Sequence, residues 1–176
     1  MNKIKKFTYF SIPLIIIAII TAFFIDVKTV MIILFSLLLL KAYILYKEKI
    51  GQELVVAFII SIAIASYYFY EYTTLNVMIG NLNLFPVISW TFGLVVLREI
   101  YERVKWKHKF IAITVLYIVV LVILEYIGYN FLGIHLSSNF PGLWQINAMH
   151  SPLVLKIIYF AVGPLYLAIT DYLKVK

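Results

Sequence analysis

Six long apolar runs occupy most of this chain and limit what it can fold into. They lie at about residues 7–25, 30–46, 54–72, 84–104, 110–131 and 153–170. A helix needs about 20 mostly apolar residues to cross roughly 30 Å of hydrocarbon with its backbone groups paired internally. We therefore predict an all-α fold, a polytopic transmembrane bundle of six helices that forms a single domain over residues 1–176.

The composition excludes the main alternatives to a membrane protein. Apolar residues make up 64% of the 176-residue chain and charged residues 13%. Soluble domains average about 45–50% apolar residues, and a domain of this size leaves roughly a third of its surface exposed. The absence of cysteine excludes a disulfide scaffold, and the high hydrophobicity excludes intrinsic disorder. The runs also lack the alternation of period two that marks β-barrel strands.

The basic residues predict the orientation of the bundle. Lys3, Lys5 and Lys6 precede the first run, and five basic residues lie at or just after the end of the fourth, within positions 98–109. Because loops rich in Lys and Arg stay in the cytoplasm, both groups belong on one side, which requires an even number of crossings between them. We expect both termini to be cytoplasmic in a multi-pass protein of the cell membrane. A basic face beside anionic lipids explains the net charge of +7 without nucleic acid, so membrane lipids and another membrane protein are the expected partners.

Ionisable residues near the predicted outer surface indicate a candidate site. Five side chains are expected in one layer there: Glu71, Glu125, His135, His150 and Lys156. Each ionisable group in an apolar span is costly and is therefore a functional hypothesis. The alternative is that Glu125 and Lys156 form a structural ion pair while the others are merely interfacial.

Two half-polar stripes add detail to this hypothesis. On the last run the stripe holds Lys156, Tyr159, Gly163, Tyr166 and Thr170, and on the fifth it holds Thr114, Tyr117, Leu121, Glu125 and Gly128. Facing each other, the stripes would line an outward-facing cleft covered by loop 135–152, with ligand contacts from Glu71, Trp144, Lys156, Tyr159 and Tyr166. The alternatives are that the stripes are packed helix faces joined by polar residues, and that the loop is anchored at the interface by Phe140 and Trp144.

A second group of charges is expected at the inner side. Its members are Lys41, Arg98, Glu99, Glu102 and Asp171. Long basic side chains that reach the interface account for most of this group, because their apolar stems can stay buried while the charge reaches water.

Three kinds of function remain open at this point. The first is a non-catalytic membrane protein that binds a lipidic or amphiphilic ligand or a partner helix. The second is a lipid-modifying enzyme in which Glu125 is the acid/base, His150 or His135 its proton partner, and Lys156 the headgroup contact. The third is a small transporter or a subunit of a larger complex. No cofactor or metal is expected, because no metal-binding, phosphate-binding or dinucleotide motif occurs.

Residues 85–166 resemble small prokaryotic integral membrane proteins of six spans. The resemblance rests on Phe85-Pro86 at the start of the fourth run, on Glu125 late in the fifth, and on Trp144 and His150-Ser151 in the following loop. That group has no established activity. The resemblance therefore implies a membrane location and a shared architecture.

Overall fold

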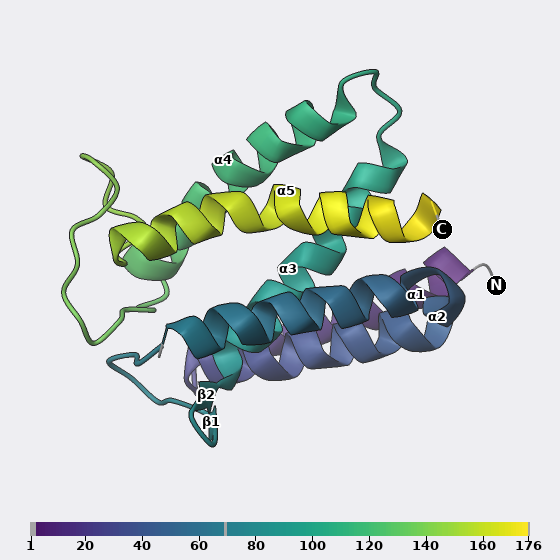
Figure 1. The fold of residues 1–176 in the computed structure, drawn as a ribbon. Coiled ribbons are helices and arrows are strands. Elements are labelled where there is room, and N and C mark those ends of the chain that lie inside the picture. The colour runs from purple at the N-terminus through teal and green to yellow at the C-terminus, as the bar shows by residue number, and fades with distance from the viewer. Residues whose placement is uncertain (1–2, 69, 176) are drawn as a thin grey trace.

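The computed structural model describes residues 3–68 and 70–175, with side chains from residue 7 to residue 174 apart from position 69. The side chains of Lys3, Lys5, Lys6 and Lys176 lie outside this description. The described chain is mostly helical, 72% (Figure 1). Its elements are α1 (Lys3–Thr21), α2 (Val27–Tyr67), β1 (Met78–Ile79), β2 (Leu82–Asn83), α3 (Leu84–Arg103), α4 (Lys109–Asn130) and α5 (Leu153–Val175). The all-α prediction is confirmed.

Four of the five helices in the described chain are long and apolar enough to cross a membrane. They are α2, α3, α4 and α5, and α1 holds a shorter apolar stretch, Phe7–Thr21. This confirms the prediction of a helical membrane protein. The described chain has five helices where six were expected, because the second and third predicted spans are the two arms of α2, which meet at a kink at Tyr46 without a loop between them.

Helix α2 folds back on itself at Tyr46, where φ is −132° and ψ is 23°. A straight helix of its 41 residues would be about 60 Å long. Yet Lys28 in the first turn hydrogen-bonds to Thr74, which follows the end of the helix. The two arms of α2 therefore run in opposite directions, as Figure 1 shows. Residues 47–53, predicted as a connecting loop, are helical instead.

The fold has two ends with different character. The loop end holds the connections 22–26, 68–83 and 131–152, whereas the basic end holds the bend of α2, the connection 104–108 and both chain ends (Figure 1). At the loop end the chain is tied down locally, because Asp26 caps α2 and Asn83 caps α3 through side-chain hydrogen bonds to backbone amides. The structure thus separates a loop-rich end from a charge-rich end.

The buried core lies among α2, α3 and α5. Leu94 of α3 and Leu167 of α5 are almost fully buried, and Phe35 of the first α2 arm stacks on Phe92 of α3 with ring centroids 4.3 Å apart. Helix α4 differs from the others, because Ile113 is its one buried residue in the described chain. Its exposed apolar surface is what a bilayer would cover, since lipid tails are as apolar as leucine.

Candidate functional site

Three aromatic rings form a stack at the loop end. The phenol ring of Tyr129, in the last turn of α4, lies between the imidazoles of His135 and His150, with ring centroids 4.2 and 3.9 Å away. His135 also hydrogen-bonds through Nε2 to the Tyr129 carbonyl oxygen at 2.7 Å. The two predicted histidines are therefore brought together, joined by a tyrosine that sequence reasoning had not selected.

Backbone pairing fastens the first part of the long loop to the segment that follows α2. The Thr73 amide donates to the His135 carbonyl at 2.9 Å, and the Ser137 amide donates to the Glu71 carbonyl at 2.8 Å. Glu71 thus takes part through its backbone, while its side chain is exposed. His135 is therefore held on one side by this backbone pairing and on the other by its hydrogen bond to the Tyr129 carbonyl of α4.

The second part of the loop is held by Lys156 at the start of α5. Its ammonium group donates to the carbonyl oxygens of Pro141 at 2.7 Å and Gly142 at 3.3 Å. Lys156 is 7% exposed, and no ion pair among the described residues joins it to Glu125. The alternative of a structural Glu125–Lys156 ion pair is therefore wrong. The Lys156 ammonium group binds the carbonyl oxygens of Pro141 and Gly142 instead of the Glu125 carboxylate.

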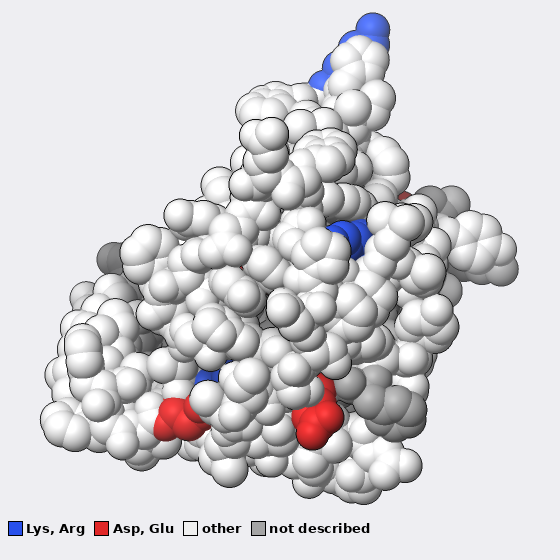
Figure 2. Space-filling view, turned by 90° about the vertical axis from the view of Figure 1, so that its left-hand side faces the viewer, with Lys and Arg blue, Asp and Glu red and all other residues white. Residues whose placement is uncertain are grey.

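An open hollow lies beside the ring stack. It measures about 420 Å³, including space open to solvent, and its lining residues are Thr73, Tyr129, His135, Leu136, Ser137, Ser138, Asn139, Phe140 and His150. The lining offers hydroxyl, amide and imidazole groups and contains no carboxylate. Figure 2 shows the loop end from outside, where charged atoms are sparse among uncharged ones.

Beneath the stack lies a cluster of tyrosines near Glu125. The hydroxyl groups of Tyr70 and Tyr159 are 2.7 Å apart, and the Tyr117 hydroxyl donates to the Tyr159 carbonyl. Glu125 precedes Tyr129 by four residues, so the two side chains lie on the same face of α4.

The polar stripe predicted on α5 is covered by neighbouring helices. Lys156, Tyr159 and Tyr166 are 7%, 4% and 0% exposed. Tyr166 lies toward the basic end, where its hydroxyl donates to the carbonyl of Glu53 at 3.2 Å. This burial agrees with the alternative of a packed helix face rather than with an exposed cleft.

Trp144 lies away from the hollow. It is 90% exposed at the tip of a tight turn, in which the Ile146 amide donates to the Leu143 carbonyl at 2.9 Å. Its φ of 50° is unusual for a bulky residue. An exposed tryptophan at one end of a helical bundle is typical of a membrane-interface anchor, which was the alternative interpretation of this residue.

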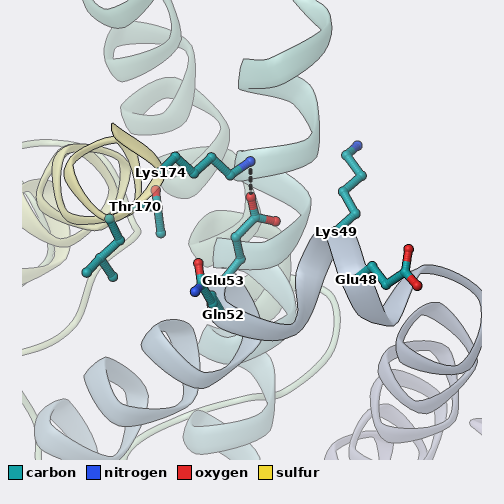
Figure 3. A pocket seen from close by; sticks show the side chains of 7 residues that line it. Glu48, Lys49, Gln52, Glu53, Thr170 and Lys174 are labelled. Carbon is teal, nitrogen blue, oxygen red and sulfur yellow. Dashed lines mark ion pairs between the residues drawn. The ribbon is translucent and has the colours of Figure 1, made fainter. Parts of the chain in front are cut away.

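The basic end carries a network of ion pairs. Arg98 of α3 is 3% exposed and pairs with Glu53 of α2 at 3.2 Å and with Asp171 of α5 at 2.5 Å. Lys174 of α5 reaches Glu53 at 2.7 Å, as Figure 3 shows. The network therefore ties three helices together at one level.

The network also includes exposed members around this buried centre. Lys49 pairs with Glu99 at 2.7 Å and with Glu102 at 3.1 Å. Of the group predicted for the inner side, Arg98, Glu99, Glu102 and Asp171 are indeed joined, whereas Lys41 lies over the ring of Phe10 at 5.0 Å. Sequence reasoning missed Glu53, Lys49 and Lys174. The signal available for Glu53 was its position directly before an apolar run.

A shallow pocket opens beside the network. It measures about 280 Å³ with its open space, and its lining residues are Glu48, Lys49, Gln52, Glu53, Thr170, Leu173 and Lys174 (Figure 3). Two carboxylates and two ammonium groups lie in this lining, so their formal charges balance. Because Lys49 and Lys174 already pair with acidic residues, the geometry indicates a structural role for the pocket walls.

Comparison of the chain with protein-family models, curated proteins and solved structures found no match. Within the described residues, no group of three or more His, Asp or Glu side chains is arranged to hold a metal ion. The assignment of a function therefore depends on the geometry of the two ends.

Proposed function

We propose that this chain is an integral protein of the cell membrane that crosses the bilayer six times. The crossings are α1, the two arms of α2, α3, α4 and α5. The basic end faces the cytoplasm in this proposal, and the loop end faces outward. The distribution of cations supports this orientation, because the two lysines at the loop end, Lys28 and Lys156, are only 2% and 7% exposed.

We further propose that the loop end binds a lipidic or amphiphilic ligand without catalysing a reaction. The hollow beside the Tyr129 stack is the observation that carries this proposal, because polar groups line it at the end of α4, the least buried of the four candidate spans. A polar head in the hollow would leave the tail against the apolar surface of α4, where Tyr126 and Phe131 are exposed. Pockets with a few polar groups beside apolar surface are typical ligand sites.

The arrangement of the histidines supports binding over acid/base catalysis. Both ring nitrogens of His150 are hydrogen-bonded within the loop, and His135 uses one nitrogen on the Tyr129 carbonyl. In the described chain no hydrogen bond or ion pair joins Glu125 to either histidine. A proton relay requires its members within hydrogen-bond reach, directly or through one water.

Native mass spectrometry of the protein purified in a maltoside detergent tests the proposal. We expect an amphiphile to stay bound to the wild type and to be lost from Asn139→Trp, because the indole would fill the hollow. Gln145→Trp is the matched control, since Gln145 is exposed on the loop outside the lining. Equal retention in both variants, or no bound amphiphile in the wild type, would contradict the proposal.

A further inference from the structure

The two ring nitrogens of His150 both face oxygen atoms that accept hydrogen bonds. Nδ1 lies 2.9 Å from the Phe140 carbonyl oxygen, and Nε2 lies 2.9 Å from Oδ1 of Asn147. A neutral imidazole carries one N–H and therefore satisfies one acceptor, whereas an imidazolium carries two. The number of acceptors at His150 therefore depends on whether the Asn147 amide presents its oxygen or its nitrogen to the ring.

The orientation of the Asn147 amide is fixed by its neighbour Asn130. The Asn130 side-chain nitrogen donates to two carbonyl oxygens, those of Tyr126 and Asn147, each at 2.9 Å. Its Oδ1 is therefore the atom that faces Asn147, and it accepts a hydrogen bond from the Asn147 side-chain nitrogen. Turning the Asn147 amide over would set two acceptor oxygens against each other. Asn147 thus presents its oxygen to His150, and only a ring with two N–H groups would satisfy both acceptors.

We infer that the hollow at the loop end takes the anionic headgroup of an amphiphile when His150 is protonated. This inference rests on the proposed function and names the chemistry of its ligand. The charge of the imidazolium lies in a wall that contains no carboxylate. Both ring nitrogens of His150 are hydrogen-bonded within the loop, so the imidazolium attracts the headgroup through its charge alone. Hydrogen bonds to the headgroup must come from other groups.

Donors remain free in the segment that lines the hollow. In the described chain, the backbone amides of Ser138 and Asn139 donate to no carbonyl, and the exposed Asn139 side chain forms no hydrogen bond. Uncommitted amides beside a positive charge are suited to phosphate oxygens. The expected headgroup is therefore a phosphate ester, and a free phosphate ion shares that chemistry.

Other titratable groups surround His150 on each packed element. On the loop, His135 lies across the Tyr129 ring, and on α5 the Lys156 ammonium binds the carbonyls that follow Phe140. The carboxylates on neighbouring elements are Glu71, which is exposed, and Glu125, one turn before Tyr129 on α4. Neither forms an ion pair with a histidine in the described chain. Histidine is the side chain whose ordinary charge change falls between pH 5 and 8, so measurements at two pH values in this range compare the two forms.

Binding of dioctanoylphosphatidylglycerol to the detergent-purified protein tests the inference. The phosphodiester keeps one negative charge between pH 5.5 and pH 8, so a pH effect reports the protein. We expect affinity roughly tenfold higher at pH 5.5. The expected effect is lost in Asn139→Glu, which places a carboxylate in the hollow, and kept in Asn139→Gln, its uncharged counterpart. Nitrogen NMR of histidine-labelled protein should show His150 with both ring nitrogens protonated at pH 5.5.

Uncharged dioctanoylglycerol and inorganic phosphate complete the experiment. Inorganic phosphate changes from monoanion to dianion within this pH range, so its binding is compared between the two Asn139 variants at pH 5.5. Phosphate bound by Asn139→Gln and not by Asn139→Glu identifies a free ion as the ligand, whereas binding of the lipid alone identifies an anionic headgroup, and both support the inference. Equal affinity at both pH values, equal binding by the two Asn139 variants, or a neutral His150 at pH 5.5 would overturn it. If dioctanoylglycerol binds the hollow equally well, the proposed function stands and the anion inference fails. If none of the three probes binds, both fail.

Discussion

At the scale of single residues, a close contact sets the spacing of α4 and α5. The ring of Tyr117 lies over Gly163, where an added Cβ would come within 2.6 Å of the ring. No ordinary side-chain contact is that short, and the Tyr117 hydroxyl is already held by a carbonyl of α5. Gly163, which sequence reasoning placed on a half-polar stripe, is therefore a packing residue.

Gly163→Ala should lower the free energy of unfolding by about 1–3 kcal/mol, because overpacking forces the ring or the helix to move. Gly93→Ala is the matched control, since nothing lies within 4 Å of a Cβ added there. In an exposed helix position alanine is favoured over glycine by about 0.5–1 kcal/mol. Denaturation in mixed micelles, followed by circular dichroism, measures both variants. Equal free energies of unfolding for Gly163→Ala and Gly93→Ala would contradict a close contact between Tyr117 and Gly163.

Asp26 is a second residue with a measurable role. Its carboxylate accepts from the amides of Lys28 and Thr29 and pairs with the Lys28 ammonium at 3.2 Å. Partial burial by itself raises the pKa of this carboxyl, but the hydrogen bonds and charge of Lys28 and the Thr29 amide outweigh burial and lower the pKa. The stabilisation from Asp26 is therefore present above the unfolded-state pKa of about 3.9 and is lost as the pH falls through the lower folded value.

Asp26→Ala should cost about 1 kcal/mol at pH 7 from the lost cap, and more because the buried Lys28 loses its carboxylate. Asp26→Asn keeps the cap and removes only the charge, so the difference between the variants isolates the cap. Thermal unfolding in detergent at pH 7 and at pH 3 measures both effects. If Asp26→Asn destabilises the protein as much at pH 3 as at pH 7, the charge is not the cause.

At the scale of the elements, the helices were predictable but one connection was not. Lys47, Glu48 and Lys49 interrupt the apolar runs and suggested a polar loop, yet they continue the helix after the bend at Tyr46. Such residues are good helix formers, so local propensity allowed either outcome. The ion pairs of Lys49 with Glu99 and of Glu53 with Arg98 favour the helical conformation. These long-range contacts cannot be inferred from a single sequence.

The candidate site at the loop end could also be predicted only in part from the sequence. Stripes with a spacing of three and four residues on α4 and α5 indicate a helix face, but the pattern is identical for a packed face and for a cleft. The buried Tyr159 and Tyr166 belong to packing. The hollow instead depends on Ser137, Ser138 and Asn139, small polar residues whose placement by the loop pairing has no sequence signature. The histidines were identified because ionisable groups are rare in this chain.

Arg98 should hold α2, α3 and α5 together at the basic end. Arg98→Met would remove the cation shared by Glu53 and Asp171 while Lys174 still pairs with Glu53, so the loss should stay below the roughly 3–5 kcal/mol of a fully broken buried pair. Arg103→Met is the matched control, because Arg103 is exposed and its pair with Glu99 contributes about 0–1 kcal/mol. Denaturation in mixed micelles compares them. Similar losses in the free energy of unfolding for the two variants would contradict a larger contribution of the buried Arg98 than of the exposed Arg103.

At the scale of the whole molecule, composition and charge predicted most of what the fold shows. The apolar surface of α4 and the gathering of charges at one end follow from the runs and from their basic flanks. The orientation in the membrane is the central claim, because it places the hollow outside and the ion-pair network inside. The proposed ligand and its pH dependence both assume an outward-facing loop end.

Cysteine labelling tests this claim directly, since the natural chain has no cysteine to interfere. Single cysteines replace Lys105 between α3 and α4, Glu48 at the bend of α2, and Gln145 in the long loop. With a membrane-impermeant maleimide, we expect labelling of Gln145→Cys in intact cells and labelling of the other two variants only after lysis. Labelling of Lys105→Cys in intact cells, with Gln145→Cys protected, would contradict it.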